Sequence, residues 1–177
     1  MQLTTSSLLT FLVVVGGISS SVSAIPRQQV APRQAPPRGQ IPQNVTKLLN
    51  QLPANAAEPL DFFPKDFGVQ RGIPLGDGSA RCQGANPSVA IDCSCPPDVD
   101  DPTFRAAVKI GLNMGFYPQP DVTMPIKIDE WNNNGQLGDK ELQKKRNLVM
   151  VIAIQSLTGN KGLGCPGVSV PVLGGTG

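Results

Sequence analysis

Apolar residues recur at helical spacing after Asp101, and this pattern predicts an amphipathic helix. Asp101 can accept hydrogen bonds from the first backbone amides, and Pro102 suits the first helical position because it lacks an N–H. Gly115 predicts the end of the helix. The face that we expect to be buried carries Phe104, Ala107, Val108, Gly111 and Leu112.

A second helix is predicted after Asp139, which occupies a capping position behind a polar turn at residues 132–138. Residues 140–147 are mostly helix formers without a breaker, and we expect the helix to end near residues 158–159. Residues 149–154 are rich in β-branched side chains, so a strand is the alternative there. The expected buried face carries Leu142, Val149, Ile152 and Ala153.

Two other stretches predict strands. Residues 122–128 alternate between apolar and polar side chains, and Pro125 places the strand at a sheet edge because it cannot donate to a ladder. Three alternating valines at residues 168–172 predict a terminal strand beside the first. Two main helices against such a short sheet make a small α+β body, which we expect over residues 82–173.

Residues 44–81 predict one short helix followed by a loop. The helix ends at Pro53, and its apolar residues are Val45, Leu48, Leu49 and Leu52. The loop holds Phe62, Phe63 and Phe67 among many Gly and Pro residues. We expect these rings to anchor the loop to the core, and a surface platform for sugars is the alternative.

Residues 1–24 predict a secretory signal peptide. Their apolar stretch ends in the small-residue pattern Val22-Ser23-Ala24, which is typical of a cleavage site, and it is too short to span a bilayer. A buried N-terminal helix is the alternative interpretation. Residues 25–43 are rich in Pro, Gln and Arg, and we expect a disordered tail that is a spacer, a removable propeptide or an attachment to an anionic surface.

Four cysteines, Cys82, Cys93, Cys95 and Cys165, form an even set. In an oxidising compartment such a set predicts two disulfides. A bond between Cys93 and Cys95 would close a strained ring, so each of them is expected to pair with Cys82 or Cys165, which leaves two pairings open. Asn44 begins an Asn-Val-Thr triplet that is an acceptor for N-glycosylation in a secreted protein.

The 177-residue chain contains no histidine. This excludes catalysis by a Ser-His or Cys-His pair and zinc sites with histidine ligands. With 15 basic and 13 acidic residues, the formal charge of +2 does not indicate a nucleic-acid partner. The C-terminal residues lack the long hydrophobic tail of a lipid-anchor signal. We therefore expect no membrane span, no cofactor and no enzymatic activity.

One stretch partly fits the template of a calcium-binding loop. Its candidate ligands are Glu130, Asn132, Asn134, Gln136 and Glu141. The first ligand should be Asp, a glycine stands at the ninth position, and three prolines prevent a normal entering helix. We therefore favour no metal and a plain Asn/Gly turn followed by a capped helix.

Acidic residues could also supply the carboxylate pair that glycoside hydrolysis needs. The candidates are Asp98, Asp100 and Asp101, or Asp129 with Glu130. A glycosidase also needs a long cleft with stacking rings, and the chain has one Trp and one Tyr, so we interpret these residues as helix caps and solvated charges. The basic triplet at residues 144–146 is interpreted as a solvated helix face.

Several short runs around the cysteines resemble small secreted four-cysteine proteins of filamentous fungi. The runs are Asp-Phe-Gly-Val at 66–69, Cys-Gln-Gly-Ala at 82–85, Cys-Ser-Cys-Pro-Pro-Asp at 93–98, Gln-Ser-Leu-Thr-Gly at 155–159 and Gly-Cys-Pro at 164–166. The resemblance covers roughly residues 66–166 and implies an extracellular or cell-wall protein. Some conidial surface proteins that hide spores from immune recognition are similar, and the resemblance implies no catalytic or ligand residues.

Our leading hypothesis is therefore a non-enzymatic secreted protein of the cell wall or spore surface. It would cover or adhere to the surface, with a cell-wall polysaccharide or another surface polymer as its partner. The first alternative is a secreted effector that binds a host protein through the aromatic loop at residues 62–67. The second alternative is a small carboxylate-dependent glycoside hydrolase.

Overall fold

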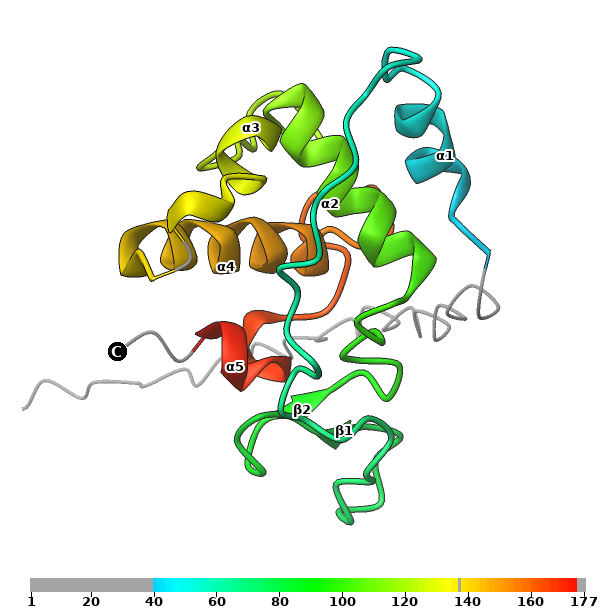
Figure 1. The fold of residues 1–177 in the computed structure, drawn as a ribbon. Helices are drawn as coiled ribbons and strands as arrows, with labels where there is room; N and C mark the ends of the chain where they lie inside the picture. The colour runs from blue at the N-terminus through cyan, green and yellow to red at the C-terminus, as the bar shows by residue number, and fades with distance from the viewer. Residues whose placement is uncertain (1–39, 137, 175–177) are drawn as a thin grey trace, which may run out of the picture. The chain divides into compact units, whose positions relative to one another are not determined.

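The computed structural model describes residues 40–136 and 138–174, and it shows a small α+β domain with two disulfides, as the sequence predicted. The predicted signal peptide at residues 1–24 and most of the predicted tail at 25–43 lie outside the described residues. Figure 1 shows the order of the elements. They are α1 (Gln43–Leu49), β1 (Cys82–Gln83), β2 (Ala90–Ile91), α2 (Pro102–Met114), α3 (Ile128–Trp131), the 3₁₀ turn η1 (Asn134–Gln136), α4 (Lys140–Gln155), the 3₁₀ turn η2 (Gly167–Ser169) and α5 (Pro171–Gly174).

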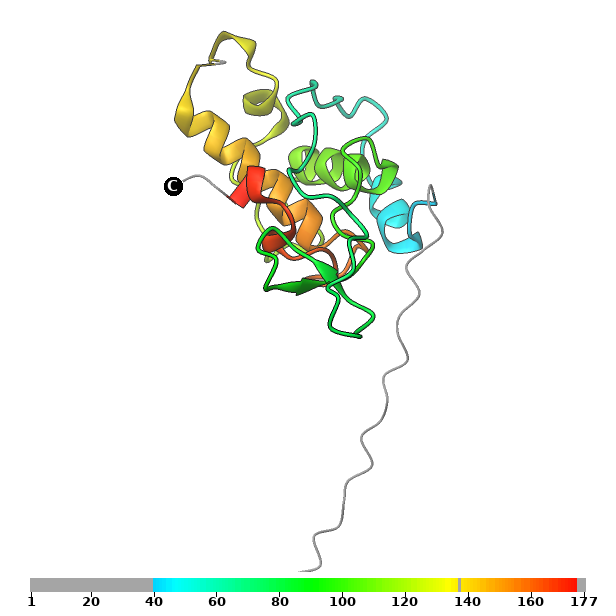
Figure 2. The same cartoon turned by 90° about the horizontal axis from the view of Figure 1, so that it is seen from below.

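The two long helices, α2 and α4, pack against each other and form the centre of the core, and both views place them side by side (Figures 1 and 2). Both predicted caps are confirmed. One carboxylate oxygen of Asp101 accepts hydrogen bonds from the amides of Thr103 and Phe104, and Asp139 does the same for Glu141 and Leu142. The helical interpretation of residues 149–154 is therefore correct, because the cap and the helix formers before them start a helix that continues through this run.

The predicted strand at residues 122–128 is wrong. The described structure has only an isolated bridge between Phe116 and Thr123 there, followed by α3. Burial still alternates, since Ile126 is buried while Thr123 and Lys127 are exposed. The alternation reflects an extended chain with one face toward the core. Its backbone does not pair with a second strand; instead, the Met124 amide donates a hydrogen bond to the carbonyl of Gly115, at the end of α2.

The predicted terminal strand at residues 168–172 is also wrong, because η2 and α5 occupy this stretch. The amides of Ser169 and Val170 bond back to the carbonyls of Pro166 and Gly167, which winds the chain tightly. Val170 is consequently fully buried, while the other two valines of the run lie at the surface. The valines recur every two residues, as in a strand, but the backbone here makes a turn of about three residues.

The small sheet lies in a region where no strand was predicted. β1 and β2 pair antiparallel with Cys82 opposite Ile91, and the Gln83 amide also bonds to the Ile73 carbonyl. The side chain of Arg81 donates to the carbonyls of Ala90 and Ile91 across the same pair. Strands of two residues are too short to leave a periodic pattern in the sequence.

A strap of residues 57–71 crosses the outside of α2, as the trace in front of that helix shows in Figure 1. Asn113 near the end of α2 bonds to the backbone of Ala57, and Arg105 near its start pairs with Asp61 at 3.0 Å. The predicted anchoring by Phe rings is confirmed. The centroid of the Phe63 ring lies 5.6 Å from that of Phe104, and the Phe67 ring is buried against the same residue.

The prediction that residues 144–146 form a solvated helix face is wrong for Arg146, which is buried. Only 1% of Arg146 is exposed, and its guanidinium carbon lies 3.8 Å from the centre of the Phe62 ring. Its Nη2 donates to the carbonyls of Trp131 and Asn133, at 2.6 and 3.2 Å. Burial lowers the pKa of Arg146, and the aromatic face and the two carbonyls stabilise the charge that remains inside the protein.

In the described part of the chain, no helix has both the length and the apolar character required to cross a membrane.

The buried guanidinium gives a direct prediction. Arg146→Ala should lower the free energy of unfolding by about 2–4 kcal/mol, because it leaves a cavity and two carbonyls without a donor. The control is Lys145→Ala, which removes a side chain that is 47% exposed and paired with Glu130, and should cost less than about 1 kcal/mol. Urea unfolding measures both, and equal losses in the two variants would contradict the assigned role of Arg146.

Candidate functional site

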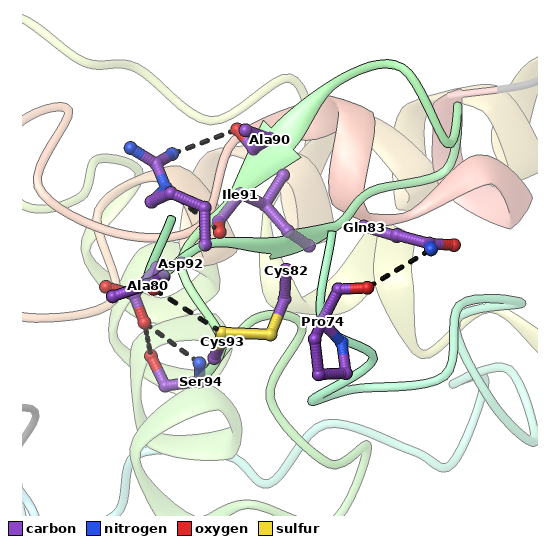
Figure 3. The surroundings of a disulfide bond; sticks show 10 residues. Pro74, Ala80, Cys82, Gln83, Ala90, Ile91, Asp92, Cys93 and Ser94 are labelled. Carbon is purple, nitrogen blue, oxygen red and sulfur yellow. Dashed lines mark hydrogen bonds between the residues drawn. A yellow bond between two sulfur atoms is a disulfide. The ribbon is translucent and has the colours of Figure 1, made fainter. Parts of the chain in front are cut away.

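The two disulfides join Cys82 to Cys93 and Cys95 to Cys165, and no free cysteine occurs among the described residues. This confirms that Cys93 and Cys95 bond to different partners, and it selects one of the two pairings that the sequence left open. Cys93 is exposed and Cys95 is buried. Figure 3 shows the bond between Cys82 and Cys93 beside Ile91. The carboxylate of Asp92 accepts hydrogen bonds from the side chain and amide of Ser94, which lowers the pKa of Asp92 and fixes the turn between the two bridges.

A cleft of about 440 Å³ lies between the end of the strap and the chain that follows Cys95. One wall consists of residues 65–71 and the other of residues 96–100. Its lining combines two basic, three acidic and five apolar residues: Lys65, Arg71, Asp66, Asp98, Asp100, Phe67, Val69, Pro96, Pro97 and Val99. The volume falls within the range of about 300–1,000 Å³ that is usual for small-molecule sites. This cleft is the candidate functional site.

An ion pair spans the cleft. The Nη2 atom of Arg71 lies 2.5 Å from both carboxylate oxygens of Asp98. The Arg71 side chain is 22% exposed and that of Asp98 is 62% exposed, so the pair is embedded on the arginine side and open to water on the aspartate side. It holds a donor and an acceptor next to each other at a fixed place on the surface.

Local packing positions the wall formed by residues 65–71 of the strap. The Phe67 ring meets Phe104 edge to face with centroids 5.4 Å apart, and Asp66 accepts a hydrogen bond from the Gly68 amide at 2.7 Å. Gly68 has a φ of +69°, and a Cβ at this position would lie only 2.8 Å from Cγ2 of Val172. A glycine is therefore needed for both its backbone angle and its closeness to α5.

The other wall is positioned by the disulfide and by α2. Cys95 is bonded to Cys165, and the two prolines that follow it are buried. The Asp101 amide bonds to the Asp98 carbonyl at 3.0 Å, and Nε of Arg105 donates to the Val99 carbonyl at 2.7 Å. The wall is thus held at both ends, by a covalent bond and by the first turn of α2.

The fold brings together two of the runs that carry the family resemblance. Residues 66–69 lie in one wall of the cleft, and residues 96–98 lie in the other. In the sequence the two runs are separate motifs, and neither predicts a site. No signal in either run predicts the contact, because it depends on how the strap crosses α2.

The residues of the candidate calcium loop serve other contacts. Glu130 pairs with Lys145 and Glu141 pairs with Lys144, while the Asn132 side chain bonds to the backbone of Glu58 and Leu60. Asn134 lies in the exposed turn η1, and the side chain of Gln136 lies outside the described residues. Within residues 40–136 and 138–174, no group of three acidic or cysteine side chains is arranged to hold a metal ion.

The other candidate residues are only partly brought together. Asp101 caps α2 and Glu130 faces Lys145, whereas Asp98 and Asp100 both line the cleft, where Asp98 is paired with Arg71. Asn44 is exposed in the first turn of α1, where its Nδ2 donates to Oδ1 of Asn160 at 3.3 Å. Glycosylation at Asn44 stays a prediction.

Comparisons of the chain with protein-family models, curated proteins and solved structures gave no match. The resemblance to secreted fungal proteins therefore rests on the short runs of residues alone.

The two disulfides should differ in their contribution to stability. The Cys95–Cys165 bond spans 70 residues and the Cys82–Cys93 bond spans 11, so loop-closure entropy gives about 4 and about 3 kcal/mol, respectively. Replacing each pair with serines and measuring denaturant unfolding tests this order. A larger loss for Cys82→Ser/Cys93→Ser than for Cys95→Ser/Cys165→Ser would contradict it.

Proposed function

We propose that this chain is a secreted, non-enzymatic protein of the cell wall or spore surface that covers the surface by adhering to one of its polymers. The observation that carries the proposal is the complete pairing of Cys82, Cys93, Cys95 and Cys165 in two disulfides. Disulfides persist in oxidising environments and are rare in reducing ones, so this pairing favours work outside the cell. It also agrees with the signal peptide that residues 1–24 predict.

The side-chain chemistry supports adhesion over catalysis. The chain contains no histidine, and three of the five acidic residues considered for hydrolysis serve as a cap (Asp101) or in ion pairs (Asp98 and Glu130). The cleft offers several hydrogen-bonding groups at one place, which suits binding. Its walls are formed by the runs that resemble secreted fungal surface proteins, and this supports an adhesive role for the cleft.

The same resemblance supports a masking role. A layer of small folded domains attached to a wall would hide the polymer underneath from immune receptors by steric exclusion. A glycan at Asn44 would lie on the exposed side of α1 and extend that layer, and the three arginines of the tail at residues 25–43 would add attraction to anionic groups of the wall. Each of these contributions is part of the proposal.

The alternative of a host-binding aromatic loop gains no support from the strap. Phe67 is buried, and the Phe62 and Phe63 rings pack against Trp131 with centroids 6.4 and 5.4 Å apart. These rings stabilise the core and offer little surface to a partner.

Fractionation of cells that produce a tagged copy tests the proposed function. We expect the tagged chain, lacking residues 1–24, to stay with purified walls of resting spores after washes with salt and detergent. The matched control is the same tagged chain with residues 1–24 deleted from its gene, which should stay in the cytosol. Recovery of the full-signal version from the cytosol, or only from the culture medium, would contradict the proposal.

A further inference from the structure

We propose that the cleft between residues 65–71 and 96–100 binds a neutral, hydroxyl-rich polysaccharide. This inference rests on the proposed function, since it names the class of surface polymer and the place on the protein where that polymer binds. It follows from three features of the cleft: its paired donor and acceptor, its balance of charge and its apolar surfaces.

The ion pair supplies donors and acceptors side by side. Arg71 uses Nη2 to hold Asp98, and its Nε and Nη1 atoms have no hydrogen-bond partner in the described part of the chain. Asp98 is 62% exposed, so its carboxylate can accept further hydrogen bonds. A sugar hydroxyl both donates and accepts, and two neighbouring hydroxyls can therefore bridge the guanidinium and the carboxylate at once.

The charges of the cleft disfavour a charged polymer. Lys65 and Arg71 lie in the same walls as Asp66, Asp98 and Asp100, so both signs are present within one small cleft. A polyanion would meet the three carboxylates, and a polycation would meet the lysine and the arginine. A neutral polymer meets neither repulsion and can use the exposed groups among them, such as the Asp98 carboxylate, as hydrogen-bond partners.

The apolar residues provide surface for the C–H faces of sugar rings. Val69 and Val99 are half-buried and supply this surface, while Pro96 and Pro97 are buried within the wall that follows Cys95. The Phe67 ring is turned into the core against Phe104, so no aromatic ring is offered for stacking. We therefore expect weak binding by one copy, with a Kd of about 1 mM, and firm attachment through many copies on one polymer.

Titration of the mature secreted protein, followed by NMR, tests the inference. The probes are short oligomers of glucose and of N-acetylglucosamine, which are neutral, of glucosamine, which is cationic, and of galacturonic acid, which is anionic. We expect at least one neutral oligomer to shift signals of residues 65–71 and 96–100. Its Kd should change little when salt is raised, because hydrogen bonds to neutral groups are not screened as charge pairs are.

Variants with matched controls locate the site. Asp98→Asn and Arg71→Ala should each weaken binding of the neutral oligomer about tenfold while the protein stays folded, as its melting curve reports. The control is Lys161→Ala, which breaks a different exposed ion pair, that of Lys161 with Asp121. These two residues do not line the cleft, so the Kd should stay unchanged. A Kd that is equal in all three variants would overturn the inference.

Two other results would also overturn it: no response to either neutral oligomer, or tighter binding of a charged oligomer that weakens as salt rises. These failures can be told apart from failure of the proposed function. A chain that stays with spore walls without binding a neutral oligomer loses only this inference. A chain that binds the oligomer but stays in the cytosol loses the proposed function.

Discussion

The bond between Cys95 and Cys165 is the constraint on which the rest of the domain depends. It joins the segment that precedes α2 to the segment that follows α4. The bond therefore links the start of α2 to the end of α4, the two helices that form the centre of the core. The chain around Cys165 packs tightly against the end of α4. The Cys165 amide donates a hydrogen bond to the Ile154 carbonyl, and a Cβ on Gly164 would lie only 2.2 Å from that same oxygen. The bond also fixes Pro96 and Pro97, and with them one wall of the cleft.

The opposite wall is held by noncovalent contacts alone. All four cysteines follow residue 81, so no covalent bond reaches the strap. The strap stays in place because its aromatic rings enter the core and its polar groups pair with α2 and α3; the Leu60 carbonyl, for example, accepts a hydrogen bond from Trp131 Nε1 at 2.9 Å. The cleft thus lies between one wall fixed by a disulfide and one fixed by burial and hydrogen bonds.

Local chemistry explains which parts of the structure the sequence could predict. Asp101 and Asp139 start their helices through hydrogen bonds to amides two and three residues ahead, so the cap and the helix are visible in one short run. Residues 122–128 kept their alternating burial but lacked a partner strand, which no local pattern can supply. Arg146 and the pair of Arg71 with Asp98 depend on contacts across 13 to 27 positions of sequence, which only the folded chain brings together.

The most direct test of this account is the disulfide map of the protein purified without reductant. Digestion without reduction, followed by mass spectrometry of the linked peptides, identifies each pair. The account predicts one peptide pair that joins Cys82 to Cys93 and another that joins Cys95 to Cys165. Free thiols, or a bond between Cys93 and Cys165, would contradict it, because the chain before α2 would then no longer be fastened to the end of α4 in the way that forms the cleft.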